Sequence, residues 1–286
     1  MLGKSFRYLN RGSVTLLTTQ ELALRARISA LKAAHVGKTS HIGSSLSVID
    51  ILSVLYGSVA NISPSNLDDP NRDVVVVSKG HAAAGTYAVM ANAGLFPLKW
   101  LSDYSTDGSR LSGHVTSHRT PGVELSTGSL GHGLPYGVGV ALSAKRRRSP
   151  RKVYVVMSDG ECDEGTTWES ALVGNHHGLD NLTVAIDRNH LQSLMDTEDT
   201  LRLEPFADKW RAFGWDVIDV NGHNHSALIE AFTRDRENTS QRRPRVLICD
   251  TTKGKGISFM ENQVLWHYRS PSDEILALAL DELGQE

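Results

Sequence analysis

Residues 153–170 read VYVVMSDGECDEGTTWES: a short apolar run, an Asp-Gly turn and the start of a helical pattern. Other segments of the chain are also short, rich in β-branched residues and continuously apolar. Such runs are typical of a parallel sheet that is buried on both faces. Because helical patterns lie between them, the sequence predicts an α/β fold: a parallel sheet with helices on both faces and right-handed crossovers. The predicted strands are 74–78, 153–158, 182–188, 215–220 and 246–252.

The composition is that of an ordinary globular protein. The chain has 286 residues, of which 40% are hydrophobic and 22% charged, and its formal net charge is −2. This balance predicts no general binding to nucleic acids or anionic membranes, and no apolar run approaches the length that spans a bilayer. The two cysteines, Cys162 and Cys249, fit neither a disulfide framework nor a zinc site, so we expect a reducing, cytoplasmic location.

We expect one large domain. Residues 1–20 are interpreted as an N-terminal extension and residues 21–286 as a single domain. Residues 102–133 have little periodicity and many Gly, Ser, Thr and His residues, and a loop of this length is usually functional. The basic cluster 145–148 is expected to end a helix, where it complements the helix dipole. Helices are predicted at 20–38, 47–59, 81–95, 137–148, 166–179 and 225–238.

Two of the predicted strands are followed by side chains that suit a metal ion. Asp159 follows the strand 153–158, and Asn189 follows the strand 182–188. If these strands are neighbours, both side chains emerge at the sheet edge where α/β proteins bind ligands. A carboxylate, an amide oxygen and a backbone carbonyl suit Mg²⁺ or Ca²⁺, and Gly160 allows phosphate oxygens close to the backbone. An ordinary strand–turn–helix with acidic capping residues fits the same stretch.

A series of motifs, in order along residues 20–270, resembles the diphosphate-binding half of the transketolases, which depend on thiamine diphosphate. The resemblance implies the thiamine diphosphate-binding (PP-module) fold, in the form that exists as a separate N-terminal subunit. The motifs are GKTSHIGSS (37–45), SKGHAAAG (78–85), STGSLGHG (126–133), SDGECDEG (158–165), DRNHLQ (187–192) and TTKGKGISFMENQVLWH (251–267).

The resemblance implies residues that hold the cofactor and its metal ion, Mg²⁺ or Ca²⁺. Asp159 and Asn189 would bind the cation through their side chains, and Leu191 through its carbonyl oxygen. Gly160 would approach the diphosphate through its backbone. The contacts to the aminopyrimidine end are matched by Gly128 and Leu130.

The resemblance also implies catalytic residues. The cofactor acts as an electron sink while the C2–C3 bond of a ketose breaks. Imidazoles can stabilise the resulting alkoxide or accept a hydroxyl proton at neutral pH. Glu164 matches the glutamate that links the two cofactor sites of the family dimer. The histidines that match the family's cofactor and substrate channel are His41, His81, His114 and His267.

The remaining acids of the stretch 157–170 are assigned no catalytic role. Glu161, Asp163 and Glu169 are expected to be helix-start and surface acids. Cys162 is expected to be inert and to serve packing.

Several positions are weaker candidates or depart from the family pattern. His118 and His132 are weaker candidates for the channel, and Asn224 is expected to cap a helix. His132 stands where glutamine is common, Tyr268 where glycine is common, and Ser158 replaces the first glycine of the metal motif. Two of these departures, at 132 and 268, lie near the expected channel mouth, so the acceptor specificity is open.

The sequence ends before any pyrimidine-binding domain. In the family that domain supplies the carboxylate that activates thiamine and most groups that hold a sugar phosphate. The resemblance therefore implies a C-terminal transketolase-like partner subunit, an α2β2 assembly and little activity of this chain alone.

Three functions are consistent with the sequence. The first is the α subunit of a split transketolase-like enzyme that moves a two-carbon ketol unit from a ketose, or ketose phosphate, to an aldose. The second delivers the unit to a lipoyl or acyl-carrier-protein thiol, with the basic cluster 145–148 as a docking site for the carrier. The third is a non-catalytic scaffold subunit, against which the retained site residues argue.

Overall fold

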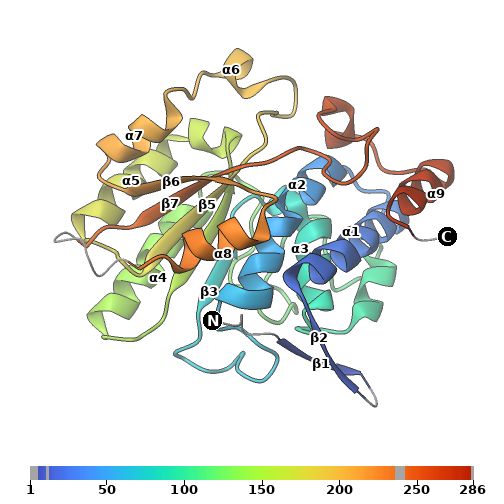
Figure 1. Ribbon diagram of the computed structural model, residues 1–286, viewed down its shortest axis with the longest axis horizontal. Coiled ribbons are helices and arrows are strands. Elements are labelled where there is room, and N and C mark those ends of the chain that lie inside the picture. The colour runs from blue at the N-terminus through green and yellow to red at the C-terminus, as the bar shows by residue number, and fades with distance from the viewer. Residues whose placement is uncertain (1–5, 11–12, 236–241, 285–286) are drawn as a thin grey trace.

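A five-stranded parallel sheet forms the centre of the computed structural model, which describes residues 6–10, 13–235 and 242–284. The strand order is β3-β4-β5-β7-β6, and each neighbouring pair is parallel (Figure 1). The predicted parallel sheet is confirmed. The strands are β3 (Val74–Val77), β4 (Val153–Ser158), β5 (Leu182–Arg188), β6 (Asp216–Asn221) and β7 (Arg245–Asp250).

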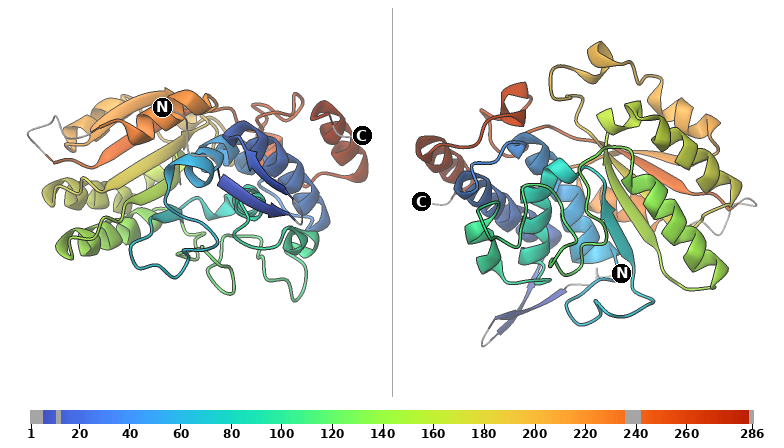
Figure 2. Two further views of the ribbon diagram at one scale, coloured as in Figure 1. Left: turned by 60° about the horizontal axis from the view of Figure 1, so that its bottom comes forward. Right: turned by 180° about the vertical axis from the view of Figure 1, so that it is seen from behind.

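Helices cover both faces of the sheet, as the apolar runs predict. Alternate side chains of β3 enter two separate cores, because successive residues of a strand point to opposite faces. Val75 and Val77 pack in one core, and Val74 and Val76 in the other. The first core includes α1 (Thr19–Val36), α2 (Ile42–Val54), α3 (Ala83–Asn92) and α8 (His225–Thr233). The second includes α4 (Gly133–Arg146), α5 (Gly165–His176) and α7 (Phe206–Ala212), with α4 and α5 in view from behind in Figure 2.

The helix α2 continues into a π-helix, Leu55–Val59, and is the apolar centre of the first core. By length and composition the stretch Ile42–Val59 could cross a membrane, so the expectation that no run reaches this length is wrong. Scattered serines and Asp50 interrupt the apolar run without lowering its mean hydropathy below 1.5. However, 89% of the stretch is buried inside the protein, as in a core helix.

The N-terminal extension contains a hairpin that the sequence analysis does not predict. β1 (Phe6–Asn10) and β2 (Ser13–Leu17) pair antiparallel and lead into α1, at the lower edge of Figure 1. Thr18 and Glu21 form a capping box that begins α1. Of the predicted helix 225–238, α8 ends at Thr233, and residues 236–238 lie outside the described part of the chain.

Short elements complete the fold. Two further α-helices, α6 (Thr197–Thr200) and α9 (Asp273–Glu282), lie in segments that the sequence analysis left unassigned. The 3₁₀ turns are Gly80–Ala82, Leu98–Asp103, Gly160–Asp163 and Val264–His267. Beyond the turn that ends at Asp103, the segment 104–132 has no helix or strand, in agreement with the predicted long loop.

Candidate active site

One cavity of about 200 Å³ collects the predicted site residues. It lies at the carboxyl ends of β4 and β5, where ligands of parallel sheets bind. Glu164 is the exception, because it is exposed at the N-terminus of α5 and does not line this cavity. The predicted residues that line the cavity are His41, His81, His114, Gly128, Leu130, Asp159, Gly160, Asn189, Leu191 and His267.

The two polar strand ends are brought together as the sequence analysis required, because β4 and β5 are neighbours. Asp159 is buried and accepts hydrogen bonds from the backbone N–H groups of Gly160 and His190, each at 2.8 Å. Burial, followed by the nearby Asp187 carboxylate, raises the pKa of Asp159. The Asn189 side-chain oxygen accepts from the Leu191 N–H at 3.2 Å. In residues 6–10, 13–235 and 242–284, no cluster of three or more His, Cys, Asp or Glu residues could hold a metal, so any metal site here depends on amide and carbonyl oxygens.

The four predicted histidines form a compact group. The His41 ring lies 4.6 Å from that of His267, 5.4 Å from that of His81 and 5.8 Å from that of His114, measured between ring centroids. The backbone contributes as well, since the His41 N–H donates to the His267 carbonyl at 2.9 Å. The Nδ1 atoms of His41 and His267 are buried without a hydrogen-bond partner in the structure. Polar atoms in this state are candidates for bonding a ligand.

Burial keeps these imidazoles neutral. It lowers the pKa of His41 to about 4, with His114 and Lys253 as further causes. It lowers the pKa of His267 to about 3, with Lys253 as the second cause. The pKa of His81 is well below its usual range, first because of burial and then because of Lys79. Three neutral rings therefore face the cavity at neutral pH.

Two buried lysines belong to the site and were not singled out from the sequence. Lys253 lines the cavity, and its Nζ donates to the Leu191 carbonyl at 3.0 Å. Burial, then Lys79, lowers the pKa of Lys253 to about 8. Lys79 forms a fully buried ion pair with Asp187 directly behind the cavity. The sequence places both lysines inside matched motifs, but nothing in it signals their burial.

Glu161 is the clearest correction to the sequence analysis, because it is not a surface acid. Its side chain is fully buried and accepts hydrogen bonds from the Ser78 hydroxyl, the Gly131 N–H and the Ser158 N–H. Burial raises its pKa, while these three donors act in the opposite direction. Asp163 is partly buried and accepts from Gln192 at 2.7 Å.

Other expectations for the stretch 157–170 hold. Glu169 is exposed. Cys162 is buried, and burial raises the pKa of its thiol well above the usual range, in agreement with a packing role. Asn224 caps α8 by accepting from the Ala227 N–H at 3.1 Å.

The weaker histidine candidates do not line the cavity. His118 and His132 are both exposed, and His132 Nδ1 contacts the Leu130 carbonyl at 2.9 Å. The basic cluster ends α4 as predicted, where Lys145 pairs with Asp180 at 3.0 Å.

Close approach explains two glycines around the site. A Cβ on Gly80 would lie 2.2 Å from the Thr127 carbonyl oxygen, and one on Gly133 would lie 2.3 Å from the Ser78 hydroxyl. Both distances are shorter than any real contact, so these positions require glycine. The loop that carries Gly128 and Leu130 is therefore pressed directly against the end of β3.

Comparison with known proteins agrees with this geometry. The family described as "Transketolase, thiamine diphosphate binding domain" matches residues 18–285. One of the two subunits of the apulose-4-phosphate transketolase of Actinobacillus succinogenes is 43% identical over 92% of this chain and 94% of its own. The 6-deoxy-6-sulfo-D-fructose transketolase subunit SqwG of Clostridium sp. is 37% identical over 91% of this chain and 94% of its own.

A solved structure shows the same fold. The transketolase of Campylobacter jejuni superposes with a TM-score of 0.84 and 28% identity over 94% of this chain. This chain spans 43% of the length of that enzyme. From the family match, the relatives and the shared fold together, the chain belongs to the thiamine diphosphate-binding domain family of the transketolases.

Proposed function

We propose that this chain is the α subunit of a split transketolase-like enzyme, which transfers a two-carbon ketol unit from a ketose phosphate to an aldose. The observation that carries the proposal is the single cavity that unites neutral histidines with an oxygen-rich strand edge. Relatives that match along nearly their whole length are themselves named as subunits of transketolases.

The cavity fits thiamine diphosphate with a divalent cation. Asp159, Asn189 and the Leu191 carbonyl offer the oxygen donors that Mg²⁺ prefers, with Ca²⁺ as the alternative. Lys253 would balance part of the diphosphate charge, and Gly160 leaves its backbone N–H accessible beside the phosphate oxygens. Gly128 and Leu130 would contact the aminopyrimidine end.

When bound, the cofactor supplies the electron sink for cleavage of the ketose C2–C3 bond. The protein then has to manage protons and alkoxide charge around that bond. His41 and His267 present unpartnered Nδ1 atoms, and their low pKa values keep them able to accept a proton at neutral pH. His81 and His114 lie within the same group and complete the polar wall of the channel.

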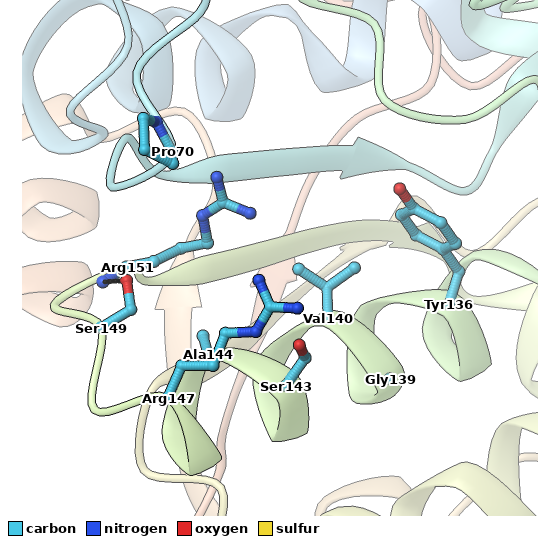
Figure 3. Close-up of a pocket in the computed structure, with 9 residues that line it drawn as sticks. All are labelled: Pro70, Tyr136, Gly139, Val140, Ser143, Ala144, Arg147, Ser149 and Arg151. Atoms are coloured by element: carbon cyan, nitrogen blue, oxygen red, sulfur yellow. Dashed lines mark hydrogen bonds between the residues drawn. The ribbon is translucent and has the colours of Figure 1, made fainter.

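A C-terminal partner subunit is part of this proposal. α5, whose first turn follows Glu164, exposes Leu172 and Val173. The neighbouring α4 exposes Tyr136 beside a hollow of about 390 Å³ that runs along the helix to Arg147 (Figure 3). Exposed apolar side chains on adjacent helices are typical of an interaction surface. We place the partner here, in an α2β2 assembly in which Glu164 links the two cofactor sites.

The relatives favour a sugar acceptor over a carrier thiol. Their names refer to apulose 4-phosphate and to a sulfonated fructose, which both carry an anionic group distant from the reacting carbons. We therefore propose a ketose donor with a terminal phosphate or sulfonate. The carrier-thiol alternative gains no support from these relatives, and the basic cluster is accounted for as the end of α4.

The test uses the chain co-purified with its partner subunit. Calorimetry should show thiamine diphosphate binding that requires Mg²⁺, and Asp159→Ala should abolish it. Mass spectrometry of reactions with a panel of ketose phosphates and aldoses should show products lengthened by two carbons. Full-rate transfer by the single chain would contradict the need for a partner, and two-carbon adducts found only on a carrier protein would contradict the sugar acceptor.

A further inference from the structure

Glu161 joins three segments that meet behind the cavity. One carboxylate oxygen accepts from the Gly131 N–H at 2.8 Å and from the Ser78 hydroxyl, and the other accepts from the Ser158 N–H at 3.3 Å. Ser78 follows β3, Ser158 ends β4, and Gly131 belongs to the loop 127–133. The side chain is fully buried, and no lysine or arginine forms an ion pair with it among the described residues.

The same contacts fix the far end of the loop 127–133. The Ser78 hydroxyl that donates to Glu161 also accepts from the Gly133 N–H at 3.0 Å. At the near end, the Thr127 hydroxyl donates to the Val77 carbonyl at 2.7 Å. Between these two anchors, only Gly128 and Leu130 of this loop line the cavity. Their positions therefore depend on both anchors.

We propose that Glu161 is a positioning residue for cofactor binding, which holds the loop 127–133 in the place where Gly128 and Leu130 meet the organic end of thiamine diphosphate. The inference rests on the proposed function. Glutamate suits this task because a carboxylate can accept from three donors at once. A glutamine would turn an N–H₂ group toward one of those donors and lose at least one bond.

The loop does not carry the metal ligands, and this separation gives the test. Isothermal calorimetry on the complex with its partner subunit compares two probes in the presence of Mg²⁺: thiamine diphosphate and inorganic pyrophosphate. Glu161→Gln should weaken thiamine diphosphate roughly tenfold, the effect of one lost hydrogen bond to a charged acceptor. Pyrophosphate, which needs only the strand edge around Asp159, should bind as it does to the wild type. Glu169→Gln, an exposed acid of the same stretch, is the matched control and should change neither.

Glu161→Asp provides a second variant that retains the charge but is one methylene shorter, and its loss should lie between those of the wild type and Glu161→Gln. Equal weakening of both probes would overturn the proposal, since Glu161 would then support the whole site rather than the loop. Unchanged binding of both probes would overturn it as well. If the wild-type complex binds pyrophosphate but not thiamine diphosphate, the proposed function fails instead, independently of any variant.

Discussion

Replacing Lys79 with methionine tests the buried ion pair behind the cavity. Lys79 and Asp187 have no solvent-exposed side-chain surface, and Lys79 Nζ donates to Asp187 Oδ2. Methionine keeps most of the apolar stem but leaves the carboxylate buried without its cation. Ser47, at 2.6 Å, and Thr251 still donate hydroxyl hydrogen bonds to it.

The expected loss can be worked from these contacts. Removing one partner of a buried pair usually costs about 3–5 kcal/mol. Because two hydroxyl donors remain on Asp187, we expect about 3 kcal/mol of the free energy of unfolding to be lost. For a chain of this size that corresponds to a decrease in Tm of roughly 6–12 °C.

The pH dependence of the loss follows from Asp187. Burial raises its pKa, but Lys79 and the hydroxyls outweigh burial and hold it below the usual value. In the wild type this ionised group therefore stabilises the fold above the unfolded pKa and loses that contribution as pH falls. Without Lys79 the folded pKa moves upward, so the carboxylate becomes more destabilising as pH rises. The deficit of Lys79→Met should be larger at about pH 7.5 than at about pH 5.

Urea unfolding followed by tryptophan fluorescence, on wild type and variants at both pH values, gives these free energies. The double variant Lys79→Met/Asp187→Asn removes both charges and should recover most of the loss. Arg211→Met breaks an exposed pair with Asp208 and should change stability by less than about 1 kcal/mol. A deficit below about 1 kcal/mol for Lys79→Met, or one that does not change with pH, would refute the reasoning.

Three further predictions concern the site and the core. Gly80→Ala should lower Tm and weaken thiamine diphosphate binding, because its Cβ would overlap the Thr127 carbonyl; Gly139→Ala, where a Cβ meets nothing within 4 Å, should be neutral or stabilising. Unfolding free energy should fall between about pH 7 and about pH 5, because the unfolded chain binds protons that the buried imidazoles refuse; His267→Asn should make the decline shallower in urea titrations, and a flat wild-type profile would contradict the pKa order. Both cysteine thiols should resist a thiol reagent until urea unfolds the chain, and rapid labelling of the native protein would contradict their burial.

The sheet and the strand-edge pair could be predicted because their signals are local. Continuous apolar runs mark strands buried on both faces, and the position of Asp159 and Asn189 directly after such runs places them at one edge. Only the adjacency of β4 and β5 had to come from the structure.

The role of Glu161 could not be predicted, since two of its three partners are backbone N–H groups that carry no signal in the sequence. Acids near a helix start are usually solvated, so composition favours the wrong interpretation. The burial of Lys79 and Lys253 was missed for the same reason, because it depends on contacts from distant segments. The hairpin β1–β2 lies in a segment that was interpreted only as an extension.

The place of β7 in the sheet has a consequence for synthesis on the ribosome. β7 is the last strand of the sheet in the sequence, yet it lies between β5 and β6, and within the sheet β6 pairs only with β7. While the chain is being made, β5 therefore presents an open edge until residue 250 has emerged, and β6 has no neighbour in the sheet to pair with. Unpaired strand edges of this kind invite pairing with other chains. The nascent protein is thus most exposed to aggregation and chaperone binding in the interval between β5 and β7, and the cofactor cavity, which needs Lys253 and His267, closes only after that interval has ended.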